Sequence, residues 1–165
     1  MIMKKYGLIF ILFFTILFTD VFAQEKLRRK DCFFGWHFDF HASYVDKELG
    51  KNFDTDTLDE FIKRTKPDFI QIDSKGHPGY SSYPTKIGYS ANSFINDPIK
   101  LWKGVAEKYN VATFVHYSGL LDTEALKRHP EWSRISQNGL PDKDRVGFFS
   151  KYSDELLIPQ LKEMI

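Results

Sequence analysis

The sequence predicts an α/β fold, namely the N-terminal part, about three βα units, of a (β/α)₈ barrel (TIM barrel). Three short apolar runs with strand-like alternation are separated by segments with helical periodicity. The turns that enter the strands are short, whereas the loops that leave them are long and polar, as in barrels whose active site is built from those loops. An open doubly wound sheet is the alternative, but no Gly-rich phosphate-binding motif follows the first strand, so dinucleotide binding has no support.

The first 23 residues read as a signal peptide. Lys4 and Lys5 precede an apolar run over residues 8–18, and Ala23 ends a pattern of small residues that signal peptidases recognise. We therefore expect cleavage after Ala23 and export of residues 24–165 to the periplasm or the extracellular space. The apolar run is too short for a comfortable membrane span, so no membrane association is expected after cleavage.

Composition excludes two classes of protein. Cys32 is the only cysteine, so a small scaffold held together by disulfides is excluded. Without residues 1–23 the acidic and basic side chains are equal in number, which leaves a net charge of zero with neutral histidines. Such a balance gives no support to a nucleic-acid partner.

The first predicted strand, residues 36–41, alternates aromatic and polar side chains. An extended backbone places the three aromatic rings on one face and three ionisable side chains on the other, His37, Asp39 and His41. An antiparallel strand with one solvated face would show the same alternation. The repetition of the pattern in the next two strands favours a shared polar pocket instead.

The second and third strands also end in polar groups. Residues 68–75 place Gln71, Asp73 and Lys75 on one face of the predicted strand, and His77 follows in a Gly-rich loop. Residues 111–118 end in three polar side chains, His116, Tyr117 and Ser118. Because the carboxyl ends of parallel strands meet at one edge of a sheet, these groups are expected to lie together.

Helices are expected between the strands. Thr57 and Glu60 have the spacing of a capping box, and Pro67 stops this first helix before the second strand. Asp97 and Pro98 supply the cap and first position of a second helix, with a buried stripe of Ile99, Trp102, Val105 and Ala106.

The rest of the chain is predicted to consist of long loops and one further helix. Residues 77–96 and 120–149 read as loops, the second with turn signals at residues 138–139 and 141–142. Residues 152–165 form an amphipathic segment that Pro159 should kink or restart. A barrel needs about 250 residues, so we expect a truncated sequence whose domain continues beyond residue 165.

Five short motifs carry a resemblance to a known family. They lie at residues 35–41, 75–80, 83–85, 116–118 and 129–132. In these motifs, and from about Phe34 to the end of the chain, the sequence resembles the hypothetical glycosyl hydrolase 6 family, which is related to α-L-fucosidases. Some relatives carry a trimerisation domain, so a homo-oligomer of the full-length protein is compatible with the resemblance.

The resemblance to α-L-fucosidases implies an enzyme that hydrolyses terminal sugars of glycans. It implies that His37 and His77 hydrogen-bond the sugar, although Gly76 and Pro78 depart from the histidine and aspartate of the main fucosidase family. It also implies a retaining mechanism with two carboxylates, both expected beyond residue 165.

Nine residues are the candidate sugar-binding set: His37, Asp39, His41, Lys75, His77, Tyr80, His116, Tyr117 and Trp132. Neutral imidazoles donate and accept hydrogen bonds as sugar hydroxyls do, and Tyr80 and Trp132 offer rings for stacking. Pairing with Asp73 or Asp39 is an equal alternative for Lys75. Packing within the loops is the favoured interpretation for Tyr83, and a structural role for His129.

Two other functions remain open. The histidines at the strand ends, with Asp39, are also the donor types of an amidohydrolase-like metal site, although such enzymes usually begin with two histidines one residue apart. A sugar-binding remnant without activity is the expectation if residues 1–165 are the natural product. The glycosidase interpretation requires no cofactor and no metal.

Overall fold

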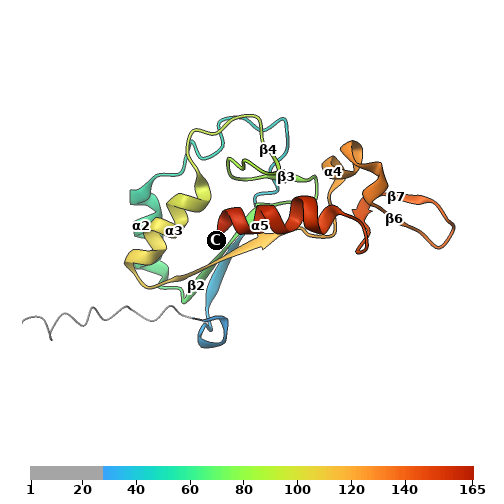
Figure 1. Ribbon diagram of the computed structural model, residues 1–165. Helices are drawn as coiled ribbons and strands as arrows, with labels where there is room; N and C mark the ends of the chain where they lie inside the picture. The colour runs from blue at the N-terminus through green and yellow to red at the C-terminus, as the bar shows by residue number, and fades with distance from the viewer. Residues whose placement is uncertain (1–27) are drawn as a thin grey trace, which may run out of the picture.

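A mixed α/β fold is seen in the computed structural model, which describes residues 28–165 (Figure 1). The expected signal peptide lies outside the described residues. A 3₁₀ turn, η1 (Arg29–Asp31), leads into three parallel strands: β1 (Gly35–Phe38), β2 (Phe69–Lys75) and β5 (Ala112–Tyr117). The central strand β2 pairs with β1 on one side and β5 on the other. The predicted βαβ order is thus confirmed as a partial parallel sheet.

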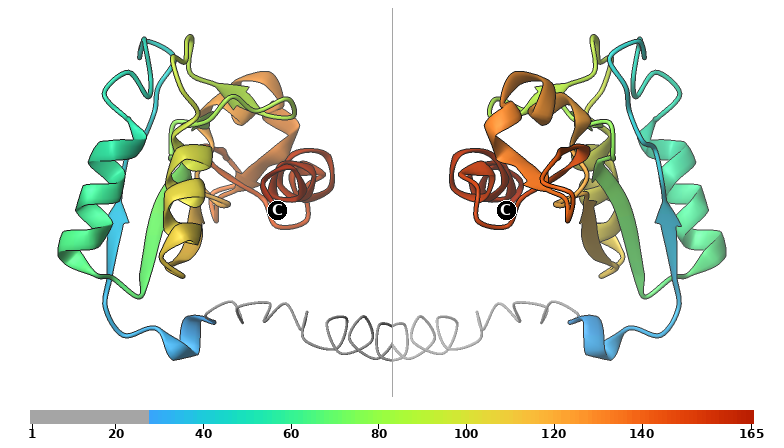
Figure 2. Two further views of the ribbon diagram at one scale, coloured as in Figure 1. Left: turned by 90° about the vertical axis from the view of Figure 1, so that its left-hand side faces the viewer. Right: turned by 90° about the vertical axis from the view of Figure 1, so that its right-hand side faces the viewer.

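Two helices cover one face of this sheet, α2 (Thr55–Thr65) and α3 (Pro98–Lys108). In Figure 2 both lie in front of the strands in the left view and behind them in the right view. Asp97 caps α3 by accepting the backbone N–H of Lys100, as the sequence predicts. For α2 the predicted capping box of Thr57 and Glu60 was wrong. The cap is Asp54, which accepts the N–H of Thr57, and the helix starts at Thr55.

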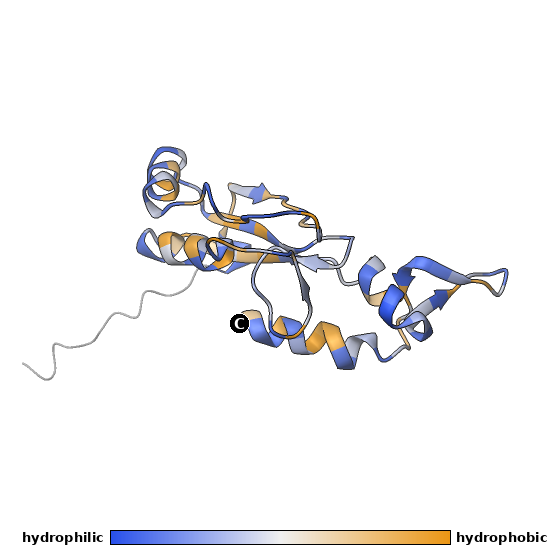
Figure 3. Cartoon of the chain, turned by 90° about the horizontal axis from the view of Figure 1, so that it is seen from above, coloured by the Kyte–Doolittle hydropathy of each residue, from blue (hydrophilic) through white to orange (hydrophobic). Residues whose placement is uncertain are grey.

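The core lies between these helices and the sheet. Its buried members are all apolar and come from α2, β2, α3 and the residue that precedes β5: Leu58, Ile62, Ile70, Ile72, Trp102, Val105, Ala106 and Val111. Figure 3 shows the apolar residues gathered where α2 and α3 meet the sheet. The expected stripe on α3 is therefore the buried one, and β2 turns its isoleucines toward the helices.

The two predicted loops contain regular structure. Residues 77–96 include two short strands, β3 (Tyr80–Ser81) and β4 (Tyr89–Ser90), and β3 pairs with the end of β2. Residues 120–149 hold the helix α4 (Thr123–Arg128), the 3₁₀ turn η2 (Pro130–Trp132) and a hairpin, β6 (Ser133–Ile135) and β7 (Pro141–Val146).

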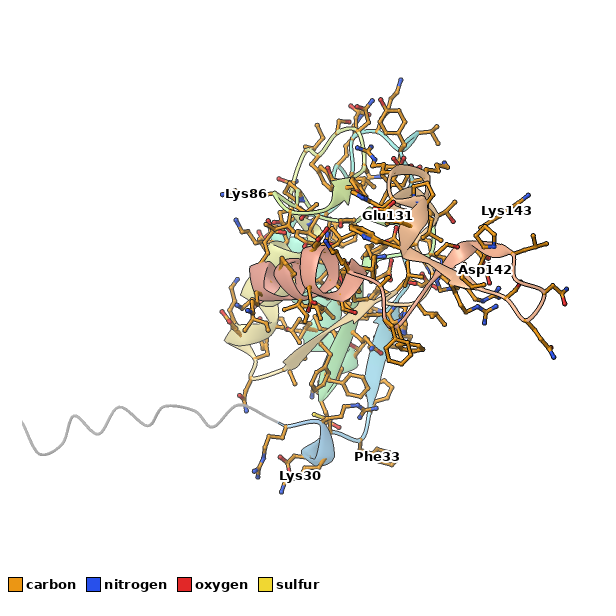
Figure 4. The ribbon with its side chains drawn as sticks, turned by 45° about the vertical axis from the view of Figure 1, so that its right-hand side comes forward. Lys30, Phe33, Lys86, Glu131, Asp142 and Lys143 are labelled. Carbon is orange, nitrogen blue, oxygen red and sulfur yellow. The ribbon has the colours of Figure 1, made fainter. Side chains whose placement is uncertain are left out.

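The prediction that residues 120–149 form a long loop was therefore wrong, because a helix and a hairpin lie there. The hairpin turns near Gly139, whose φ of 75° favours glycine, while the expected turn at 141–142 is the start of β7. In Figure 4 the hairpin, marked by Asp142 and Lys143, projects on the side opposite Lys86. A second apolar cluster holds α4, the hairpin and the following helix together.

The last segment is a π-helical turn, η3 (Ser153–Leu157), followed by α5 (Ile158–Met164). Pro159 stands in the first turn of α5, and the backbone is helical on both sides of the junction, so the π-helical turn runs directly into α5 without a break. A cavity of about 420 Å³ lies on the helix side of β5, lined by α3, β5 and the end of α5. Within residues 28–165, the helices are all too short or too polar to cross a bilayer.

Candidate functional site

The first strand has the two faces that its sequence predicts, but it ends at Phe38, so Asp39 and His41 lie beyond the strand and not within it as predicted. On the helix side the Phe38 ring lies 4.7 Å from that of Trp102, centroid to centroid. On the other side the His37 ring lies 5.5 Å from that of His116, which belongs to β5. Aromatic burial on one face thus holds the strand in the orientation that presents His37 on the other.

Asp73 ties the ends of the three strands together. Its side chain is fully buried on β2, and its Oδ1 lies 2.8 Å from Nδ1 of His116. Its Oδ2 accepts the backbone N–H of His41 at 3.2 Å. One carboxylate therefore positions a ring from β5 and the backbone that follows β1.

His41 and His77 complete the cluster. The Nε2 atom of His41 lies 3.1 Å from Oδ1 of Asp39, and its ring is 5.0 Å from that of His77. Nδ1 of His77 lies 2.9 Å from the hydroxyl of Ser118, which itself donates to the carbonyl of Leu121 at 3.0 Å. One hydrogen bond from Ser118, the residue that follows β5, thus holds the His77 ring.

The approach of His41 to β2 depends on a glycine. An added Cβ at Gly76 would lie 2.6 Å from Cδ2 of His41 and 3.0 Å from its Cα. His41 itself has a φ of 37°, in the left-handed region that a residue with a side chain seldom adopts. Such strain persists only where the surroundings enforce it, and it is concentrated at functional sites.

Five of the nine predicted residues therefore form one cluster, defined as His37, Asp39, His41, His77 and His116. It lies at the carboxyl edge of the parallel strands, where β2 runs toward β3 and β4 (Figure 1). The side chains of Asp39 and His41 are 53% and 40% exposed, so the cluster is open to a ligand from solvent.

Lys75 lies elsewhere and has a partner that the sequence did not predict. Its ammonium group donates to Oδ2 of Asp122 at 2.8 Å, with both side chains buried. The predicted partners, Asp73 and Asp39, were wrong, because a bulge between Asp73 and Lys75 interrupts the alternation of β2. Burial lowers the pKa of Lys75, and the Asp122 charge opposes that effect.

Tyr117 is partly buried beside this ion pair, and Tyr80 is partly buried next to α4. The Tyr117 hydroxyl donates to Oε1 of Gln160 on α5 at 2.6 Å, and burial raises the pKa of Tyr117. Burial and the carboxylate of Glu124 raise the pKa of Tyr80 to about 12. Both tyrosines thus contact protein groups that the sequence did not identify.

Trp132 packs inside the second apolar cluster and is 4% exposed. The His129 ring stacks on it at 3.8 Å, and the Tyr152 ring lies at 5.8 Å. The structure therefore gives no support to sugar stacking by Trp132, and it is consistent with the structural role expected of His129. Tyr83 likewise packs, donating to Glu163 at 3.0 Å.

Sequence reasoning missed four residues around the site: Ser118 and Asp73 as partners of the histidines, and Asp122 and Gln160 as buried polar anchors. The sequence did contain a signal for Asp73, because its spacing of two residues from Gln71 places its carboxylate on the polar face of the strand. Nothing local marks Asp122, since its partner Lys75 is 47 residues away in the chain.

One subset of these residues has the spacing of a metal site. Donor atoms of Asp39, His41 and Asp73 all lie within 4.8 Å of one another. Two carboxylates and an imidazole are ligands that zinc accepts. Asp39 and His41 are also paired with each other through these side-chain atoms, and Asp73 accepts the backbone N–H of His41, so the geometry serves either purpose.

Comparisons with known proteins give a likeness of fold. No family model matches the sequence, and no curated protein does. α-L-Fucosidase isoenzyme 2 from Paenibacillus thiaminolyticus is 20% identical with a TM-score of 0.68, over 78% of this chain and 21% of that one. The α-L-fucosidase AlfC, a mutant in complex with 4-nitrophenyl-α-L-fucopyranoside, is 19% identical with a TM-score of 0.49, over 68% and 38%.

The first of these likenesses shows that the described part of the chain shares its fold with part of an α-L-fucosidase. The chain spans about one fifth of that protein and less than two fifths of the second.

Proposed function

We propose that the chain is the N-terminal part of an exported (β/α)₈ glycoside hydrolase of the α-L-fucosidase type, related to the hypothetical glycosyl hydrolase 6 family. The observation that carries the proposal is the cluster at the carboxyl edge of the parallel strands, the edge at which barrels of this kind bind substrate. The shared fold with part of a fucosidase supports it.

The chemistry of the cluster suits a sugar. Each neutral imidazole offers one donor and one acceptor, and a hydroxyl group offers both. The cluster contains four imidazoles from three strand ends, so it can contact several hydroxyls of one ring. A terminal deoxy sugar such as L-fucose is the substrate class that follows from the resemblance.

The catalytic carboxylates belong to the rest of the proposed barrel. Asp39 and Asp73 each hold a histidine, so neither is assigned as nucleophile or acid/base. Retaining and inverting glycosidases both need two carboxyl groups that flank the scissile bond. We place both beyond residue 165, and residues 28–165 by themselves would bind sugar without hydrolysing it.

The test is hydrolysis of aryl glycosides by the full-length protein. Release of fucose from an aryl α-L-fucoside is expected, and His37→Ala or His77→Ala should lower kcat/KM by about 10- to 100-fold, the effect of about 1.5–3 kcal/mol in lost hydrogen bonding. His129→Phe, which keeps a ring against Trp132, is the control and should retain activity. Hydrolysis of another aryl glycoside alone would refute the sugar, and no hydrolysis at all would refute the enzyme.

A metal-dependent hydrolase is the second candidate, favoured by the spacing of Asp39, His41 and Asp73. Metal analysis of the purified full-length protein separates the two proposals. Stoichiometric zinc that is lost in Asp39→Asn would establish the metal site and overturn the glycosidase proposal. Metal-free protein that hydrolyses the fucoside would exclude the second candidate.

A further inference from the structure

Two of the clustered histidines are held in the same way. His77 and His116 each bond through Nδ1 to a side chain of the protein, Ser118 in one case and Asp73 in the other. The atom left for a ligand is Nε2 in both rings. Whether that atom donates or accepts depends on which nitrogen carries the proton.

The hydrogen bonds of Ser118 determine which nitrogen of His77 carries the proton. A hydroxyl group has one proton, and the Ser118 proton is donated to the carbonyl of Leu121 at 3.0 Å. The bond of 2.9 Å between Ser118 and His77 then requires the proton to come from Nδ1. A neutral His77 is therefore the Nδ1–H tautomer, with a lone pair on Nε2.

The hydrogen bonds of Asp73 determine which nitrogen of His116 carries the proton. The carboxylate is fully buried, and an ionised carboxylate only accepts hydrogen bonds. Its two oxygens receive the His41 backbone N–H and Nδ1–H of His116, respectively. Here too a neutral imidazole carries its proton on Nδ1 and leaves Nε2 free to accept.

We propose that Asp73 and Ser118 are positioning residues that make His116 and His77 a pair of Nε2 acceptors, selective for ligands that donate two hydroxyl protons. The identity of the ligand as a sugar rests on the proposed function, whereas the state of the rings does not. Sugars in which those hydroxyls are methylated or replaced by fluorine lack the donated protons and should bind poorly.

Nitrogen NMR of the full-length protein labelled with ¹⁵N-histidine tests the state of the rings. At about pH 9, where an ordinary imidazole is neutral, the shifts of His77 and His116 should show the Nδ1–H tautomer. His77→Asn and His116→Asn assign the two signals. The Nε2–H tautomer at both positions would overturn the proposal without any variant being needed.

Two variants test the positioning residues against each other. Asp73→Asn has one oxygen for two donors, so the amide N–H₂ should face His116 and convert it to the Nε2–H tautomer, with His77 unchanged. Ser118→Ala removes the acceptor of His77 and should convert that ring alone, while Ser118→Thr restores the hydroxyl and the tautomer. Rings that keep their tautomers in both Asp73→Asn and Ser118→Ala would overturn the assignment.

Titration with L-fucose separates this inference from the proposed function. Selective shifts of the Nε2 signals of His77 and His116, lost with a fucoside methylated at its hydroxyls, are the expected result. If both rings are Nδ1–H tautomers but their signals do not shift with L-fucose or with its methylated and fluorinated derivatives, the positioning roles are sustained and sugar binding is refuted. Equal binding of the methylated fucoside would refute the selectivity for donors.

Discussion

At the scale of single residues, His41 combines an exposed imidazole with a strained backbone. Its positive φ is enforced from two sides, by the hydrogen bond of its N–H to Asp73 and by the close approach of Gly76. A residue with a side chain in this conformation costs of order 1 kcal/mol, which glycine does not incur. The site therefore carries a local cost in stability.

The first prediction compares two replacements of His41. His41→Gly relieves the backbone strain and His41→Ala keeps it, so the glycine variant should be more stable than the alanine variant by about 1 kcal/mol. Both lose the imidazole and should lose sugar binding equally. Urea unfolding measures the difference, and equal stability of the two variants would show that the conformation is not strained.

The second prediction concerns the buried ion pair of Lys75 and Asp122. Lys75→Met leaves the Asp122 carboxylate buried without its cation, which should cost about 3–5 kcal/mol of unfolding free energy. Lys51→Met is the control, because the pair of Lys51 with Glu48 is exposed and should cost less than about 1 kcal/mol. Similar losses in the two variants would contradict the structural role of Lys75.

At the scale of elements, α5 is joined to the sheet by polar contacts. Gln160 is fully buried, donates to the Ser81 hydroxyl at 2.6 Å and accepts from Tyr117. Gly88 allows this approach, because an added Cβ there would lie within 3 Å of the Gln160 amide. The helix is thus fixed by side chains from β3 and β5.

The third prediction follows from these contacts. Gln160→Leu leaves the hydroxyls of Ser81 and Tyr117 without their partner, which should lower the unfolding free energy by about 2 kcal/mol. Lys162→Leu, on an exposed position of the same helix, should change it by less than about 0.5 kcal/mol. A loss confined to Lys162→Leu would show that α5 is not held through Gln160.

Elements with their own sequence signals were predictable and those that depend on distant partners were not. The alternation around Phe38 and the Asp97–Pro98 start gave β1 and α3 directly. Residues 120–149 were misjudged because α4 and its hairpin are stabilised by packing on Tyr152 and Leu156, which come later in the chain. The positions of His37 and His116 were predictable from the alternation along β1 and β5, whereas the turn of the backbone at His41 and the bulge that turns Lys75 aside were not.

At the scale of the whole molecule, partly buried tyrosines link stability to alkaline pH. Burial, reinforced by the charge of Glu163, raises the pKa of Tyr83 to about 12, and burial raises that of Tyr117 as well. The unfolded chain loses these protons near pH 10, before the folded protein does. The stabilisation is complete below about pH 10 and is lost as the pH rises through about 12.

The fourth prediction is a fall in unfolding free energy between about pH 10 and 12, made shallower by Tyr83→Phe. Because the phenylalanine cannot ionise, its variant should differ from the wild type most at neutral pH and least near pH 12. Chemical unfolding at a series of pH values checks this. Parallel curves for the two proteins would show that Tyr83 does not contribute to the alkaline loss.

The bond between Lys75 and Asp122 has a consequence for protein engineering. Asp122 also accepts the N–H of Ala125 at the start of α4 and the hydroxyl of Tyr152, so one buried anion serves the sheet and the appended helix and hairpin at once. The segment made of Asp122, α4 and the hairpin therefore cannot be transferred to another protein by itself. Grafted onto another scaffold it would carry an uncompensated charge, and a chimera would need a lysine at the matching strand end.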